Sequence, residues 1–319
     1  PNITITAKLT EKYQKFGSIK IMSVNIDEEV SSTSTVVIKA VSGQKPKTIQ
    51  KVSLTADVDK NIPVNAQQYP NRFALIIGNE DYQSRQTGLQ SEQNVAFAKN
   101  DAQIFAQYCE NTLGVLSENI TKLTDATAGE MSQNIELISK LISKIPGSEL
   151  IFYYAGHGFP DENTKIPYLI PVDVNAGSLS SGIKLSDVYK KFGESGAKQV
   201  TVFLDACFTG GGRDAELLAA RAVKIAPKEG ILTGNIVVFT ASSGEQSALP
   251  YKENQHGMFT YFLLKKLQET KGNVTYGELD KYISQKVSVE SLRINKKEQD
   301  PKVNVSSTVL NEWEEWNMR

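Results

Sequence analysis

The chain has 319 residues, 40% of them hydrophobic, which is enough for one sizeable α/β domain with a smaller module beside it. Its 35 basic and 36 acidic side chains leave a formal net charge of −1, which argues against electrostatic binding of nucleic acid or an anionic membrane. The two cysteines, Cys109 and Cys207, form neither a disulfide framework nor a CxxC metal site. With no run of about 18 apolar residues, we expect a soluble protein. It could be cytoplasmic, or secreted after removal of a signal peptide, and the compartment stays open.

Residues 1–65 contain short β-prone stretches separated by Gly, Ser, Lys and Asp, which predicts a small β-rich module. Such a module could bind a partner protein. Prolines 63 and 70, set among polar residues, indicate a linker before the second domain, which we expect to span residues 66–319.

In that second domain, apolar runs alternate with stretches of helical periodicity, which is typical of a sheet built from βα units. The predicted strands are 73–78, 149–154, 168–171, 199–204 and 235–241. The predicted helices are 95–113, one following the Thr127/Glu130 capping box, 185–192, one around 259–267, and one from the Thr275/Glu278 capping box to about 292. The pattern predicts a mostly parallel sheet.

His157 and Cys207 each stand just past the end of a predicted strand. Ligands of open parallel sheets bind beyond the carboxyl ends of the strands, so the two side chains would meet if their strands are neighbours. A cysteine needs an adjacent imidazole to become a good nucleophile and to protonate the leaving amine. The alternative is a buried structural cysteine and an ordinary loop histidine, but the matched contexts favour a catalytic pair. The residues indicate no third partner to orient His157, so we expect a dyad.

The backbone next to this pair could stabilise an oxyanion. Gly156 and Gly158 flank the histidine and allow close backbone approach. The N–H groups of Gly158 and Cys207 could then face the developing negative charge of a tetrahedral intermediate.

The motifs Tyr154-Ala-Gly-His157-Gly and Asp205-Ala-Cys207-Phe-Thr-Gly resemble those of the caspase-like cysteine peptidases, in particular the metacaspase and bacterial orthocaspase branch. The 50-residue separation, histidine first, matches the caspase pattern. The segments 239–244 and 256–261 resemble the small-subunit portion of the family. The resemblance covers about residues 72–306. It implies a three-layer α/β/α sandwich around a mostly parallel six-stranded sheet, and cysteine endopeptidase activity.

Asp205 stands where caspases carry glutamine, two residues before the nucleophile. A carboxylate there would complement an arginine or lysine before the scissile bond. Metacaspases use an aspartate at this position in the same way. The resemblance further implies a second pocket aspartate at Asp101 and a substrate-pairing strand that includes Ser247 and Ala248. Asp101 could equally be an exposed helical acid, and the stretch with Ser247 and Ala248 could equally be a surface hairpin. Ala155 replaces a serine that is often found in metacaspases.

No metal or other cofactor is expected. Many metacaspases bind calcium through acids after the histidine motif, but here only Asp161, Glu162 and Asp173 occur between residues 159 and 174. The glycines 210–212 lack the Gly-Lys-Ser/Thr of a phosphate loop, and the chain has no Gly-x-Ser-x-Gly motif of a serine hydrolase.

The segment 208–233 offers a place for self-cleavage, because it carries Arg213, Arg221, Lys224 and Lys228 in a stretch without clear structure. An ordinary solvated loop is the alternative. Two other functions compete with the main prediction: a non-catalytic caspase-fold scaffold that recruits partners, and a relative in the same clan that cuts after a different residue.

Overall fold

The structure is a computed structural model and describes residues 55–175, 179–208, 230–244 and 246–319. The chain divides into two units, residues 1–54 and Thr55–Arg319. The sequence analysis expects the second domain to begin at residue 66, whereas the second unit begins at Thr55. Residues 1–54 of the expected β-rich module lie outside the described part. Among the helices of the described part, none is both long and apolar enough to cross a membrane.

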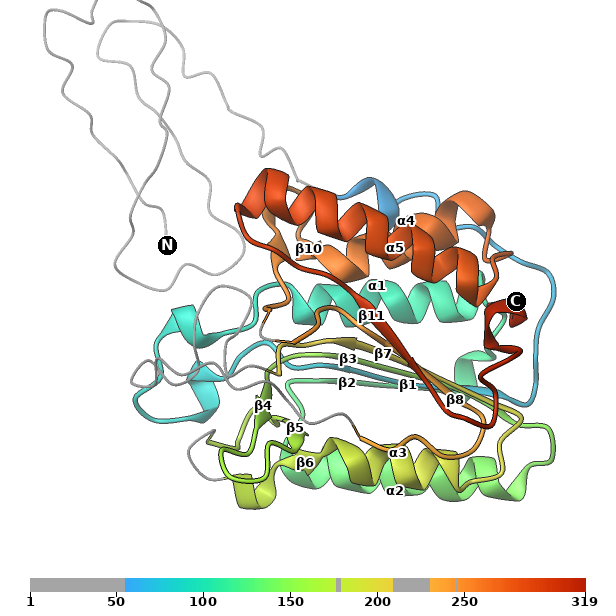
Figure 1. Ribbon diagram of the computed structural model, residues 1–319, viewed down its shortest axis with the longest axis horizontal. Helices are drawn as coiled ribbons and strands as arrows, with labels where there is room; N and C mark the ends of the chain where they lie inside the picture. The colour runs from blue at the N-terminus through green and yellow to red at the C-terminus, as the bar shows by residue number, and fades with distance from the viewer. Residues whose placement is uncertain (1–54, 176–178, 209–229, 245) are drawn as a thin grey trace, which may run out of the picture. The chain divides into compact units, whose positions relative to one another are not determined.

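A six-stranded sheet forms the centre of the second unit (Figure 1). Its strand order is β11-β8-β7-β3-β1-β2, in which β11 is antiparallel to β8 and every other neighbouring pair is parallel. The strands are β1 (Arg72–Gly78), β2 (Ile120–Thr124), β3 (Glu149–Ala155), β7 (Gln199–Asp205), β8 (Ile236–Thr240) and β11 (Lys302–Val305). The mostly parallel six-stranded sheet expected from the sequence is confirmed.

Helices cover both faces of the sheet and complete a three-layer α/β/α sandwich (Figure 1). One face carries α1 (Ala98–Asn111), α4 (Met258–Thr270) and α5 (Tyr276–Glu290), and the other carries α2 (Ala128–Lys144) and α3 (Leu185–Gly193). Both predicted capping boxes form, at Thr127/Glu130 before α2 and at Thr275/Glu278 before α5. The central strands β1, β3 and β7 are buried along almost their whole length because helices cover both their faces.

The outer strands differ from the sequence prediction. The predicted strand 168–171 forms as β5 (Pro167–Leu169), but it pairs with β4 (Gly158–Pro160) and β6 (Ile183–Lys184) in a separate three-stranded antiparallel sheet. The sequence does not predict the two edge strands of the main sheet, β2 and β11. Both are short and only partly buried, so their sequences lack a continuous apolar run. A two-residue strand pair, β9 (Pro250–Tyr251) and β10 (His256–Gly257), precedes α4.

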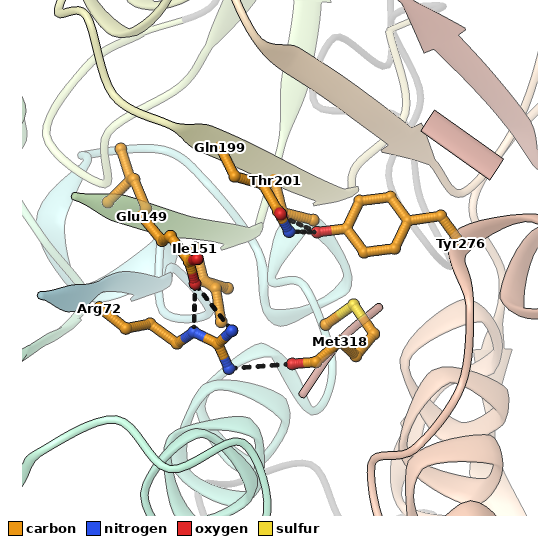
Figure 2. A pocket seen from close by; sticks show the side chains of 8 residues that line it. Arg72, Glu149, Ile151, Gln199, Thr201, Tyr276 and Met318 are labelled. Carbon is orange, nitrogen blue, oxygen red and sulfur yellow. Dashed lines mark hydrogen bonds and ion pairs between the residues drawn. The ribbon is translucent and has the colours of Figure 1, made fainter. Parts of the chain in front are cut away.

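A small polar pocket lies at the amino ends of the strands, opposite the edge that carries His157 and Cys207 (Figure 2). There the Arg72 guanidinium forms an ion pair with Glu149 at 2.7 Å and donates hydrogen bonds to the carbonyl oxygens of Leu113 and Met318. The Tyr276 hydroxyl meets the side chains of β7 in the same pocket. These contacts fasten the C-terminal segment and α5 to the sheet, so we assign the pocket a structural role.

Candidate active site

The register of two neighbouring strands brings His157 and Cys207 together. In the parallel pair β3–β7, Ala155 is the partner of Asp205, and each catalytic candidate follows two residues later. The 50-residue separation seen in the sequence is therefore the register offset of the two strands. The backbones remain in contact beyond the strand ends, because a Cβ added to Gly158 would lie 2.6 Å from the Cys207 carbonyl oxygen. Both side chains thus leave the same edge of the sheet.

Two tyrosine hydroxyls fix the backbone of His157. The Tyr82 hydroxyl accepts a hydrogen bond from the His157 N–H at 3.0 Å, and the Tyr154 hydroxyl donates to the His157 carbonyl at 2.7 Å. The Tyr82 ring also packs edge-on against the imidazole, with ring centroids 4.5 Å apart. A side chain at Gly156 would collide with these hydroxyls, which explains the glycine before the histidine. Neither tyrosine contact could be predicted from the sequence.

The carbonyl oxygen of Gln93 orients the imidazole. It lies 2.6 Å from Nε2 of His157, whose side chain is almost fully buried. A carbonyl can only accept a hydrogen bond, so Nε2 carries a proton and Nδ1 of the neutral ring is left as the basic nitrogen. The sequence indicates no third group that would orient His157. A main-chain carbonyl leaves no signature in a sequence, because every residue has one.

The thiol of Cys207 lies under the segment that precedes β9. The Ala248 N–H donates to Sγ at 2.7 Å, and Sγ lies 3.5 Å from the Ala248 carbonyl oxygen. Cys207 is only 2% exposed. Gln299, which is fully buried, holds this segment in place by accepting from the Leu249 N–H and donating to the Ala241 carbonyl, both at 2.9 Å.

The hydrogen bonds between β4 and β5 do not use the Gly158 N–H. In the antiparallel pair β4–β5, the Ile170 N–H donates to the His157 carbonyl and the Asp161 N–H to the Ile166 carbonyl. Ladder hydrogen bonds fall on alternate residues, so Gly158 occupies a position where the N–H points away from β5. This geometry allows the N–H of Gly158 to act with that of Cys207 on an oxyanion.

The two aspartates expected to bind substrate both reach the first turn of α4. Asp205 is fully buried and accepts hydrogen bonds from the Thr260 hydroxyl at 2.6 Å and the Thr260 N–H at 3.2 Å. Asp101, also fully buried, accepts from the Gly257 N–H at 3.1 Å and from Nδ1 of His256 at 2.6 Å. Asp101 is thus not the exposed helical acid that the sequence left open. Carboxylates suit this place because unpaired N–H groups give a helix N-terminus a partial positive charge.

Residues that could bind a metal do not gather in the described part of the chain: within it, no group of three or more His, Cys, Asp or Glu side chains could hold an ion. Of the acids after the histidine motif, Asp161 bonds within its own turn, to Thr164, and Asp173 caps the start of α2 through the Ala128 N–H. The basic residues suggested for self-cleavage, Arg213, Arg221, Lys224 and Lys228, lie outside the described residues.

The sequence matches the family described as Caspase domain over residues 71–311. A search of the curated proteins gives no match. Among solved structures, the chain resembles caspase-1 from Spodoptera frugiperda with a TM-score of 0.52 and 14% identity, covering 77% of this chain and 92% of that one. It also resembles protein GSU0716 from Geobacter sulfurreducens with a TM-score of 0.52 and 18% identity, covering 74% and 94%. These structural likenesses support the fold, and the family match extends over more than half of the sequence. The chain therefore belongs to the Caspase domain family.

Proposed function

We propose that this protein is a cysteine endopeptidase that cleaves peptide bonds after arginine or lysine. The observation that carries the proposal is the matched register of β3 and β7, which sets His157 and Cys207 at one sheet edge, where the backbones of Gly158 and Cys207 approach closely. A buried cysteine kept for packing would not need a histidine at the corresponding position of the next strand. Nor would it need a carbonyl that fixes the proton of that histidine on Nε2.

In the proposed reaction, Nδ1 of His157 takes the proton of the Cys207 thiol and the sulfur attacks the scissile carbonyl. The negative charge on the carbonyl oxygen would be stabilised by the N–H groups of Gly158 and Cys207. His157 returns the proton to the leaving amine as the C–N bond breaks, which leaves a thioester on Cys207. A water molecule then attacks the thioester, transfers a proton through His157 to the sulfur, and releases the acid product.

The preference for a basic side chain rests on Asp205 and Asp101. Both are buried carboxylates that meet the first turn of α4, and Asp205 is two residues from the nucleophile. An arginine guanidinium can bind a carboxylate through two parallel hydrogen bonds, and a lysine ammonium can pair with it as a point charge. Asp205 is the nearer of the two to the thiol in sequence, so we assign it the main contact and Asp101 a supporting one.

Substrate binding is coupled to exposure of the thiol in this proposal. An extended substrate that pairs with Ser247 and Ala248 would use the backbone N–H and C=O groups of that segment. In the structure, the same two groups of Ala248 meet Sγ of Cys207. Pairing with substrate would thus draw Ala248 off the sulfur and free it for attack.

Self-cleavage within residues 208–233 belongs to the same proposal, because an arginine or lysine there would be tethered close to its own active site. Incubation of the purified protein should then yield two fragments, and the Cys207→Ala variant should stay intact. A fully active protein that remains a single band would remove self-cleavage while leaving the peptidase proposal in place.

The test is a panel of fluorogenic peptides that differ only in the residue before the reporter: arginine, lysine, aspartate or asparagine. We expect cleavage after arginine and lysine, abolished in Cys207→Ala and in His157→Ala. Cys109→Ala is the matched control, since Cys109 is fully buried in α1 away from the site, and it should retain activity. A peptide that ends in an arginyl acyloxymethyl ketone should label the thiol covalently. Mass spectrometry should then show the mass of one bound peptide on the wild type and none on Cys207→Ala.

The outcomes separate the competing functions. Cleavage that survives in Cys207→Ala would refute the mechanism, and a preference for aspartate or asparagine would refute the pocket. A protein that neither cleaves any peptide nor takes the label would be a scaffold. For specificity, Asp205→Asn should lose arginine cleavage by about 30-fold or more, the loss typical of removing one partner of a buried charge pair. Asp280→Asn, a half-buried aspartate on α5, serves as its control.

A further inference from the structure

The second histidine of the chain, His256, lies fully buried between two carboxylates. Its Nδ1 is 2.6 Å from an oxygen of Asp101, and its Nε2 is 2.7 Å from an oxygen of Asp59. An ionised carboxylate accepts hydrogen bonds but cannot donate them, so both ring nitrogens must carry a proton. His256 is therefore an imidazolium clamped at both ends. We call Asp59, His256 and Asp101 the buried triad.

The surroundings of His256 favour this charge. Burial opposes protonation, but the hydrogen bonds and negative charges of Asp101 and Asp59 outweigh it and raise the pKa of His256 to about 9. Asp101 faces the ring from α1 and Asp59 from the turn Asp57–Asp59. From α4, the titratable neighbour is Tyr261, whose ring centroid is 6.4 Å away. The geometry thus sets a positively charged ring between two carboxyl groups.

The triad leads directly to the pocket for the substrate side chain. Asp101 accepts from the N–H of Gly257, the N-cap residue of α4, so the triad fixes the start of that helix. Three residues further, still in the first turn of α4, Thr260 donates two hydrogen bonds to Asp205. The Thr260 hydroxyl also meets that of Tyr153 on β3 at 2.6 Å. The position of Asp205 beside the nucleophile therefore depends on the same helix turn that the triad holds.

Asp59 is presented by a turn that is bound on several sides. The Tyr108 hydroxyl of α1 donates to the Val58 carbonyl at 2.8 Å. From α4, the Tyr261 hydroxyl and the Lys265 ammonium bind the Asp57 carboxylate at 2.9 and 2.6 Å. Val58 itself is fully buried. The turn is thus anchored independently of His256, and Asp59 is held at a fixed place against the ring.

We propose that Asp59 and His256 are positioning residues for substrate specificity: together they hold Asp101 and the first turn of α4, and through Thr260 they hold Asp205 where it receives an arginine or lysine side chain. The inference rests on the proposed function and adds two residues to it that do not touch the reacting atoms. It also links the chain segment before β1 to the specificity pocket.

The chain offers a matched pair of variants to test this. Asp59→Asn removes a carboxylate from His256, whereas Asp57→Asn makes the same chemical change two residues away in the same turn, where the partners are Tyr261 and Lys265. We expect Asp59→Asn to raise the KM for an arginine peptide ~10-fold with kcat changed less than about twofold, since binding and not chemistry is affected. Asp57→Asn should leave KM within about twofold of wild type, because the Tyr108 hydroxyl and the buried Val58 still anchor the turn.

A readout that needs no activity accompanies the kinetics. The protein has two histidines, so imidazole ¹⁵N NMR of the Cys207→Ala protein can follow both, and His256→Gln assigns the signals. We expect His256 to titrate near pH 9 in the Cys207→Ala protein without a further change and with Asp57→Asn, and at lower pH with Asp59→Asn. In kinetics, KM for the arginine peptide should rise with pH as His256 loses its proton. In Asp59→Asn this alkaline rise of KM, the alkaline limb of the pH profile, should occur at lower pH.

The outcomes distinguish the two proposals. A His256 that is neutral at pH 7, or an Asp59→Asn variant that behaves as Asp57→Asn in both KM and titration, would overturn the inference while arginine cleavage by the wild type stands. A wild type without preference for arginine or lysine would overturn the proposed function, and the positioning role with it. If Asp59→Asn fails to fold, the wild-type titration and its alkaline KM limb still decide the matter.

Discussion

Gly158 allows a quantitative prediction, because the space for a side chain at this position can be measured. A Cβ added here would lie 2.6 Å from the Cys207 carbonyl oxygen and 2.6 Å from the Phe208 ring, whereas ordinary van der Waals contacts begin near 3.4 Å. In Gly158→Ala the two backbones must therefore separate by about 0.8 Å, the difference between these distances. The Phe208 ring can rotate away, but the carbonyl belongs to the chain that carries the nucleophile.

We expect Gly158→Ala to lose about 1–3 kcal/mol of unfolding free energy, as overpacked sites do. Since a misplacement near 1 Å in an active site can cost about 100-fold in rate, kcat/KM for an arginine peptide should fall roughly 10- to 100-fold. Urea unfolding and peptide kinetics on the same preparations measure both effects.

The matched control is Gly129→Ala in α2, where the new methyl group meets no atom within 4 Å. This variant should be as active as wild type and up to about 1 kcal/mol more stable, because alanine favours a helix over glycine. A Gly158→Ala enzyme with wild-type kcat/KM would refute the claim that the Gly158 and Cys207 backbones must approach this closely for catalysis.

Three further predictions concern the surroundings of the site. Tyr82→Phe removes the acceptor of the His157 N–H, so the unfolding free energy should fall by about 1–3 kcal/mol and kcat/KM should fall with it. A variant as active as the wild type would speak against a role for this contact in catalysis. The pKa of His256 is raised from 6.5 to about 9, so its stabilisation, roughly 3 kcal/mol, should be complete below pH 6.5 and lost as the pH rises through 9. Urea unfolding at both pH values should show this difference in wild type but not in His256→Gln. Finally, Gln299→Leu should loosen the segment over Cys207 and speed its alkylation by iodoacetamide, which mass spectrometry can follow; an unchanged rate would mean that this segment does not shield the thiol.

The central part of the fold and of the site could be predicted from the sequence because both depend on strong local patterns. The buried strands β1, β3 and β7 are continuous apolar runs, and the capping boxes mark where α2 and α5 begin. Parallel strands that end at one edge then place the side chains that follow them. His157 and Cys207 could therefore be expected at the same edge of the sheet before any contact was known.

The rest depends on contacts between distant segments that no local pattern records. Asp59 and His256 are 197 residues apart in the sequence, and each looks like an ordinary polar residue in its own neighbourhood. The edge strands β2 and β11 are stabilised by pairing with the sheet more than by their own composition. The carbonyl of Gln93 belongs to the same class, since its role depends only on where the fold carries it.

The paired register of β3 and β7 has a consequence for how such a protein can change. The alignment of His157 with Cys207 depends on the pairing of two strands, and the length of chain that connects them does not enter. Insertions in the exposed turn at residues 162–165 can therefore accumulate, and with them new regulatory or partner-binding elements, while the chemistry is inherited unchanged. Deletion of the single residue between Asp205 and Cys207 would instead turn the sulfur to the opposite face of the sheet. Evolution and protein engineering thus have wide freedom in the connection and almost none in the two residues that follow each strand.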